Sequence, residues 1–210
     1  MSNEFEYLKQ GAVLEAGCGR RWPFDRSDMD VYLVGIDLDD DALAMRTDLD
    51  RKLHGDIRTA SFPEDSFDAI YSSFVLEHVQ GAEKALDNFA RWVKPGGHIV
   101  IVVPDRDSVY GFLTRTTPLW VHTLTKRWVF GNKNAGKPGY GPYPTYHEHV
   151  IGQAGMRQFV DTHDLELVET KTSGRMRGWI QLVCRMVSYL SFGRLAHGHI
   201  NLTYVLRRHD

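Results

Sequence analysis

Hydrophobic positions in the first hundred residues alternate between strand-like runs and helix-like spacings. Short β-branched or aromatic runs predict strands at 12–15, 31–36, 67–72 and 98–103. Apolar residues three and four positions apart predict helices at 40–53 and 82–93. The second helix should stop at Lys94-Pro95-Gly96-Gly97, because a proline followed by glycines cannot continue it.

Strands that alternate with helices predict an α/β fold with a parallel sheet and helices on both faces. After residue 104 the pattern breaks into a stretch rich in aromatic residues, glycine and proline. Regular spacing returns, predicting a helix at 153–163, a strand at 166–172, a helix at 179–192 and a last strand at 201–208. Sheets of this class bind ligands at the carboxyl ends of their strands, so function should lie there.

The composition is that of a soluble globular protein, with 42% hydrophobic and 25% charged residues in 210. We expect one domain over residues 1–210. Two cysteines are too few for a disulfide framework, which suits a reducing cytoplasm. The chain begins without a basic-then-apolar signal segment and has no apolar run long enough to span a membrane.

Charge is distributed unevenly along the chain. Residues 1–107 carry 21 acidic and 12 basic side chains, whereas residues 108–210 carry 6 and 13. Two stretches, 108–147 and 170–209, contain no aspartate or glutamate. Such a split can mark a face that meets an anionic partner. Drift in the charge of a solvated surface is the alternative reading.

The first strand runs into a glycine turn, Glu15-Ala16-Gly17-Cys18-Gly19, and the second ends at Asp37. Glycine lets the backbone approach a ligand closely, and a carboxylate at the next strand end can accept hydrogen bonds from ribose hydroxyls. This pair of features fits any nucleoside binder. A dinucleotide fingerprint needs a third glycine where Trp22 stands, so a cofactor without phosphate fits better.

With the glycine turn and Asp37 included, five segments follow one another along the chain: VLEAGCG, GIDLDDDAL, GDI, FPEDSFDAIYSSFVLEHV and LDNFARWVKPGGHIVIVVP. Together they resemble class I S-adenosylmethionine-dependent methyltransferases, especially the group with an EHV element after the fourth strand and a KPGG turn before the fifth. The resemblance covers about residues 10–104 and, more loosely, the last helix and strands. It implies a doubly wound, seven-stranded, mostly parallel Rossmann-like sheet with a C-terminal antiparallel strand.

The resemblance implies that the first glycine turn holds the methionine end of S-adenosylmethionine. Glu15, Gly17 and Gly19 match the family's first motif, and backbone contact is expected at Cys18. The family often has a third glycine two residues beyond Gly19, where this chain has Arg21. We therefore expect the helix that usually follows to be short or replaced by a loop.

The same resemblance implies contacts for the rest of the cofactor. Asp37 matches the acidic residue on the ribose, and Leu38 matches the apolar residue against the adenine. Asp56 and Ile57 match the pair at the adenine edge, and Ser73-Phe74 matches the segment under the sulfonium. Each aspartate also precedes a turn, so a capping role is the alternative for either one.

Methyl transfer to a hydroxyl benefits from a general base with a pKa near neutrality, and histidine is the usual choice. Three histidines are candidates for this catalytic role: His78, His147 and His149. A structural, hydrogen-bonded histidine is the alternative for each. The His-Glu-His run at 147–149 lacks a third ligand of suitable spacing, so we predict no metal site.

Two insertions, 105–147 and 173–199, should leave the sheet at the side where the cofactor is expected. Both coincide largely with the stretches that lack acidic residues. We expect them to form a basic, aromatic cap over the substrate, with apolar surface from Trp120, Trp128 and the helix at 179–192. That helix is too short to span a bilayer but could lie in its interface.

These features predict an S-adenosylmethionine-dependent methyltransferase that methylates oxygen on a small, lipid-linked or glycan acceptor with an anionic part. Peripheral membrane contact would fit a lipid-linked acceptor. The apolar insertions could instead form core and a homodimer contact. Two other functions remain open: a non-catalytic regulatory or scaffold protein, and a nucleic-acid methyltransferase. The last is less favoured, because the isoelectric point is near 6.5 and no nucleic-acid module is recognisable.

Overall fold

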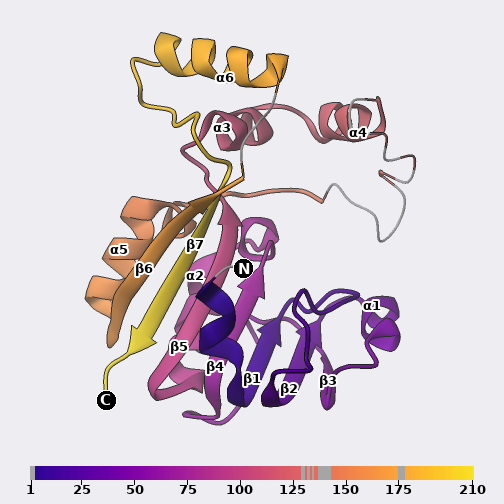
Figure 1. Ribbon diagram of the computed structural model, residues 1–210, viewed down its shortest axis with the longest axis vertical. Helices are drawn as coiled ribbons and strands as arrows, with labels where there is room; N and C mark the ends of the chain where they lie inside the picture. The colour runs from indigo at the N-terminus through magenta and orange to yellow at the C-terminus, as the bar shows by residue number, and fades with distance from the viewer. Residues whose placement is uncertain (1–2, 129–130, 132, 134, 137–142, 175–177) are drawn as a thin grey trace.

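The computed structural model describes residues 3–128, 131, 133, 135–136, 143–174 and 178–210. One seven-stranded sheet runs through this part of the chain in the order β3-β2-β1-β4-β5-β7-β6 (Figure 1). Strands β1 to β5 run parallel to one another, and β7 is antiparallel to both β5 and β6. The sequence-based prediction of a doubly wound, mostly parallel sheet with an antiparallel C-terminal strand is confirmed.

The strands are β1 (Gln10–Ala16), β2 (Asp30–Asp37), β3 (Arg51–His54), β4 (Phe67–Ser73), β5 (Val93–Pro104), β6 (Leu165–Ser173) and β7 (Asn201–Arg208). The helices are α1 (Asp40–Met45), α2 (Ala82–Trp92), α3 (Val109–Thr116), α4 (Leu119–Trp128), α5 (Gln153–Thr162) and α6 (Trp179–Leu190). Three short 3-10 helices complete the described elements: η1 (Asn3–Leu8), η2 (Leu76–His78) and η3 (His149–Ile151).

Both faces of the sheet are covered by apolar packing. On one face α2 and α5 bury Phe89, Trp92 and Phe159 against the central strands. On the other face Leu8 of η1 and Trp22 pack over Val13, within a smaller buried cluster. The central strands are therefore apolar on both sides, which explains why their sequences read as continuous hydrophobic runs.

The predicted helix at 40–53 is wrong beyond its first half. Helix α1 ends at Met45, and the chain continues through extended backbone into the edge strand β3. The apparent helical spacing of Leu49 and Leu53 is accidental, because the two side chains pack on opposite faces of the sheet. Periodicity alone could not reveal this, since both residues are partly buried.

The two insertions leave and rejoin the sheet side by side. The backbone N–H of Asp105 donates to the carbonyl of Ile200 at 2.7 Å, and Val109 donates to Ala196 at 2.8 Å. His199 Nε2 lies 2.6 Å from the buried carboxylate of Asp105. Helices α3, α4 and α6 then extend beyond the carboxyl ends of the strands, with α6 outermost (Figure 1). The sequence had indicated only apolar character for α3 and α4.

Candidate active site

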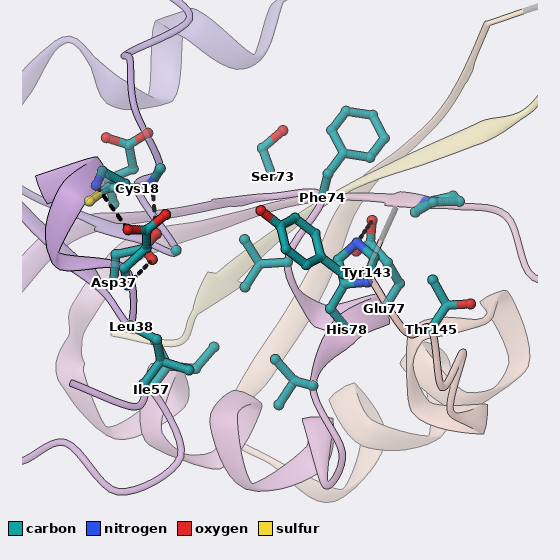
Figure 2. A pocket seen from close by; sticks show the side chains of 18 of the residues that line it. Cys18, Asp37, Leu38, Ile57, Ser73, Phe74, Glu77, His78, Tyr143 and Thr145 are labelled. Atoms are coloured by element: carbon teal, nitrogen blue, oxygen red, sulfur yellow. Dashed lines mark hydrogen bonds and ion pairs between the residues drawn. The ribbon is translucent and has the colours of Figure 1, made fainter. Parts of the chain in front are cut away.

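A cavity of about 1160 Å³ opens at the carboxyl ends of β1, β2 and β4. All ten residues expected to bind the cofactor line it, as do His78 and His147. Figure 2 shows Asp37 at one end and Glu77 with His78 at the other, with Ser73 between them. Small-molecule sites usually occupy about 300–1,000 Å³, so this cavity has room for a cofactor and a second ligand.

The glycine turn after β1 is joined directly to the end of β2. The N–H groups of Gly17 and Cys18 both donate to the carbonyl of Ile36, at 2.8 and 3.1 Å. The Asp37 carboxylate accepts from Gly19 N–H at 2.8 Å and from Asp39 N–H at 2.9 Å. Asp39, not Asp37, caps α1, so the capping alternative does not apply to Asp37.

Glycine is required at the first position of this turn. Gly17 has a φ of 75°, and a Cβ added there would lie 2.3 Å from a methyl group of Val75. Gly19 also has a positive φ, of 51°, but a Cβ there would meet no atom within 4 Å. The backbone at Gly17 is therefore pressed against the chain that follows β4, while Gly19 faces open space in the cavity.

Beneath the turn lies a buried ion pair that sequence reasoning missed. Arg46 is fully buried, and its guanidinium donates to Glu15 at 2.6 Å, to Asp48 at 2.8 Å and to the carbonyl of Cys18. Burial raises the pKa of the Glu15 carboxyl, and the hydrogen bond from Arg46 opposes that rise. Arg46 thus fixes both the acidic residue of the first motif and the backbone between its glycines.

The segment after Gly19 is irregular, as expected from Arg21. The structure describes every residue between β1 and β2, and none of them is helical. Trp22 and Phe24 instead pack edge-on against Tyr71, with ring centroids 5.4 and 5.3 Å away. Arg21 and Pro23 line the cavity. Aromatic packing on the sheet therefore holds this edge of the cavity in the place of a helix.

The end of the cavity expected to hold the adenine combines exposed and buried apolar groups. The Leu38 side chain is 65% exposed, whereas Ile57 is buried beside it in the cavity wall. Both oxygens of Asp56 accept hydrogen bonds from the Arg58 guanidinium, and one accepts from the Arg58 N–H. These hydrogen bonds lower the pKa of Asp56. Asp56 therefore closes a turn at this end of the cavity, and no helix follows it that it could cap.

Strand β4 ends in the middle of the cavity. Ser73 is its last residue, and Phe74 then adopts a φ of 57°, which is strained for a non-glycine residue. The Phe74 N–H donates to the carbonyl of Val102 at 2.8 Å. This turn directs the chain into η2, so that the EHV element lines the cavity.

The EHV element brings a carboxyl group and an imidazole together. His78 Nδ1 donates to the carbonyl of Pro144 at 2.8 Å, which places the ring lone pair on Nε2. That Nε2 lies 3.8 Å from Oε1 of Glu77. Glu77 is 2% exposed, and its Oε2 has no hydrogen-bond partner among the described residues. Burial raises its pKa to about 8.

The other two candidate histidines differ in position. His147 is buried, lines the cavity and lies 3.4 Å from the hydroxyl of Thr114 on α3. His149 is exposed and is not among the described residues that line the cavity, because it begins η3 on the far side of Glu148. The Glu148 carboxylate accepts from the N–H groups of Gly81 and Ala82 and caps α2. No cluster of three potential metal ligands occurs among the described residues.

The first insertion supplies part of the cavity wall. Tyr110 and Thr114 of α3 line it, together with Tyr143 and Tyr146 from the end of the insertion. Burial and the neighbouring Glu77 carboxyl raise the pKa of Tyr110. Trp120 and Trp128, expected to face the substrate, are exposed and are not among the described lining residues. Three basic residues of the two insertions expected to form a basic cap lie outside the described residues: Lys137, Arg175 and Arg177.

Comparison with known proteins gives the same picture as the motifs. Residues 14–101 match a family described as a methyltransferase domain. An uncharacterised methyltransferase of Mycobacterium tuberculosis is 31% identical over 151 residues, which cover 65% of this chain and 72% of that protein. A phosphoethanolamine N-methyltransferase of Triticum aestivum is 34% identical over 104 residues, or 45% of this chain. The chain spans about a fifth of the length of such plant relatives, since the match covers 21% of that protein.

Solved structures agree with the fold. An S-adenosylmethionine-dependent methyltransferase from Mesorhizobium loti has a TM-score of 0.63 at 17% identity, covering 96% of this chain and 93% of its own. The cavity fits the family's cofactor: Leu38 offers exposed apolar surface for a purine, and the Asp37 carboxylate at the end of β2 offers an acceptor for ribose hydroxyls. The family match and the mycobacterial relative show that this chain belongs to the methyltransferases, and its fold is that of S-adenosylmethionine-dependent members.

Proposed function

We propose that this chain transfers a methyl group from S-adenosylmethionine to an oxygen of a small, lipid-linked or glycan acceptor that carries an anionic part. The observation that carries this proposal is the two-ended cavity. One end holds the glycine turn with Asp37, and the other holds titratable side chains from the EHV element and from the first insertion. S-adenosylmethionine would supply an electrophilic methyl group whose bonding electron pair stays on sulfur.

The chain's own contribution at the second end is to accept a proton. The hydrogen bond to Pro144 fixes the tautomer of His78 so that Nε2 can take a proton from an acceptor hydroxyl. Glu77, 3.8 Å from that nitrogen, would share the charge that develops on the ring. His147 is the second candidate base, because it lines the same cavity. His149 does not line it.

Residues 105–147 and 173–199 would cap the acceptor. Tyr110 and Thr114 already line the cavity, and the described residues of both insertions carry no acidic side chain between 108 and 147 or between 173 and 199. A positive cap of this kind favours an acceptor with a phosphate or other anionic group. A lipid-linked acceptor would lie at a membrane surface, so peripheral contact belongs to this proposal.

Methylation of nitrogen is a second candidate. Relatives that include the wheat protein are phosphoethanolamine N-methyltransferases, and phosphoethanolamine combines an anionic phosphate with an amine. The buried Glu77 carboxyl could hold such an amine as a cation before it loses its proton. Nucleic-acid methylation and a non-catalytic scaffold role have no comparable support in the cavity.

The proposal is tested with methyl-labelled S-adenosylmethionine and a panel of acceptors that includes phosphoethanolamine and a hydroxyl-bearing lipid phosphate. We expect label in an oxygen of the product, identified by mass spectrometry. His78→Gln should lower kcat by about 10²–10⁴. His149→Gln is the matched control and should leave kcat unchanged. Label in nitrogen would select the second candidate, and full activity of His78→Gln would remove His78 as the base.

A further inference from the structure

Helix α6 turns its apolar side outward. Its second half continues into Phe192, which is 93% exposed, and Tyr189 is 83% exposed. The exposed large apolar residues of this segment, hereafter the α6 face, are Leu182, Val183, Met186, Tyr189, Leu190 and Phe192. Those on the helix recur at spacings of three and four residues, so they form one continuous stripe. A helix of a water-exposed surface normally has the opposite orientation.

The orientation of α6 is fixed by polar contacts on its inner side. Cys184 and Ser188 are buried on that side, and α6 as a whole contacts α3. The Ser188 hydroxyl donates to the carbonyl of Leu195 at 2.7 Å, and His197 Nδ1 lies 3.1 Å from Oγ of Ser188. The small, polar side of α6 therefore anchors it to the protein, and the apolar side is left for a partner.

The charge around the α6 face identifies that partner. No aspartate or glutamate occurs between Thr170 and His209, and the exposed charged residues in the described part of the segment are Arg185 and Arg194. An apolar stripe flanked by cations and free of acidic groups complements a bilayer surface with anionic headgroups. A second copy of the chain fits less well, because the same segment of that copy offers no acidic side chain to pair with Arg185 or Arg194.

The dimensions fit a helix that lies along a bilayer surface. Twelve residues make α6 roughly 18 Å long, and no described helix is long and apolar enough to cross a membrane. In Figure 1, α6 is the outermost element, so its stripe can reach a flat surface without obstruction from the sheet. Helix α3 links this surface to the cavity, since it contacts α6 and carries Tyr110 and Thr114.

We propose that the α6 face docks the protein on anionic lipid bilayers by burying Tyr189 and Phe192 among the headgroups, with Arg185 and Arg194 at its rim. The inference rests on the proposed function only for its purpose, which is access to a lipid-linked acceptor. Binding to a bilayer and transfer of a methyl group are measured separately, so either can fail without the other.

Sedimentation of the full chain with vesicles tests the docking. The vesicles are phosphatidylcholine alone or phosphatidylcholine with about one third phosphatidylglycerol, each at low and high salt. We expect binding to the anionic vesicles that weakens in salt. Tyr189→Ser with Phe192→Ser should lower that binding roughly tenfold, because two large apolar groups are removed. Tyr32→Ser, at an exposed tyrosine on β2, is the matched control and should bind as the native chain does.

The charge contribution is tested by Arg185→Glu with Arg194→Glu, which should abolish the preference for anionic vesicles, while Arg51→Glu on β3 should not. Circular dichroism verifies that each variant is folded. The absence of sedimentation with anionic vesicles, or equal binding by the Tyr189 and Phe192 variant, would overturn the proposal. So would a dimer in analytical ultracentrifugation that the same double variant dissociates, because the face would then join two copies.

Discussion

The guanidinium of Arg46 lies 2.6 Å from the carboxylate of Glu15, and both groups are buried beneath the glycine turn. Thirty residues separate the two in sequence, yet the pair ties the end of α1 to the end of β1. Arg46 also donates to the carbonyl of Cys18, which lines the cavity. One buried side chain therefore holds both the Glu15 carboxylate and the backbone of the cavity wall.

Removing that anchor should destabilise the fold. Arg46→Met leaves the Glu15 carboxyl buried without its partner, so we expect a loss of about 3–5 kcal/mol in the free energy of unfolding. Urea denaturation measures it. Combining Arg46→Met with Glu15→Gln should recover part of the loss, since the buried charge is gone. Arg51→Met, at an exposed position, should change stability by less than about 0.5 kcal/mol. A loss below 1 kcal/mol for Arg46→Met would contradict this account.

The two glycines of the turn should respond differently to alanine. Gly19→Ala costs about 1 kcal/mol, because only its positive φ is unfavourable and the added methyl meets open space. Gly17→Ala adds a clash with Val75 to the same strain, so we expect at least about 2 kcal/mol more. Thermal unfolding of the two variants compares them directly. Equal melting temperatures would show that the turn relaxes away from Val75.

Much of the architecture could be predicted because the central strands are continuous apolar runs and α2 has a clean 3.6-residue spacing. The end of α1 could not, since Leu49 and Leu53 mimic helical spacing while packing on opposite faces. The ten cofactor-binding residues that the family resemblance implied all line the cavity. Arg46 was missed because its role depends on a contact distant in sequence. His149 was included because it lies two residues from His147 in the sequence. Only the structure shows that it begins η3 and does not line the cavity.

Glu77 should make stability and activity depend on pH. Its ordinary pKa of 4.5 is raised to about 8 in the folded chain, so the neutral form is favoured by folding. The stability that this provides is fully present below pH 4.5 and is lost as the pH rises through 8. Glu77→Gln removes the dependence. Relative to the native chain, the variant should gain about 4 kcal/mol in unfolding free energy between pH 5 and pH 9.

Denaturation at a series of pH values measures this difference, with Glu83→Gln on the exposed side of α2 as the control. The native rate of methyl transfer should also rise as Glu77 ionises near pH 8, and the Gln variant should lack that limb. A stability difference that stays constant with pH would mean that Glu77 is ionised throughout this range. The raised pKa of Glu77, and with it the proposed role of this carboxyl beside His78, would then be wrong.

Binding of S-adenosylhomocysteine by isothermal titration calorimetry tests the central claim, that this cavity holds the cofactor of a methyltransferase. We predict binding with a dissociation constant in the micromolar range for the native chain. Asp37→Ala should weaken it at least about tenfold, because the ribose loses a charged acceptor. Asp41→Ala, exposed on α1, should bind as the native chain does. No heat of binding by the native chain at millimolar ligand would contradict the account.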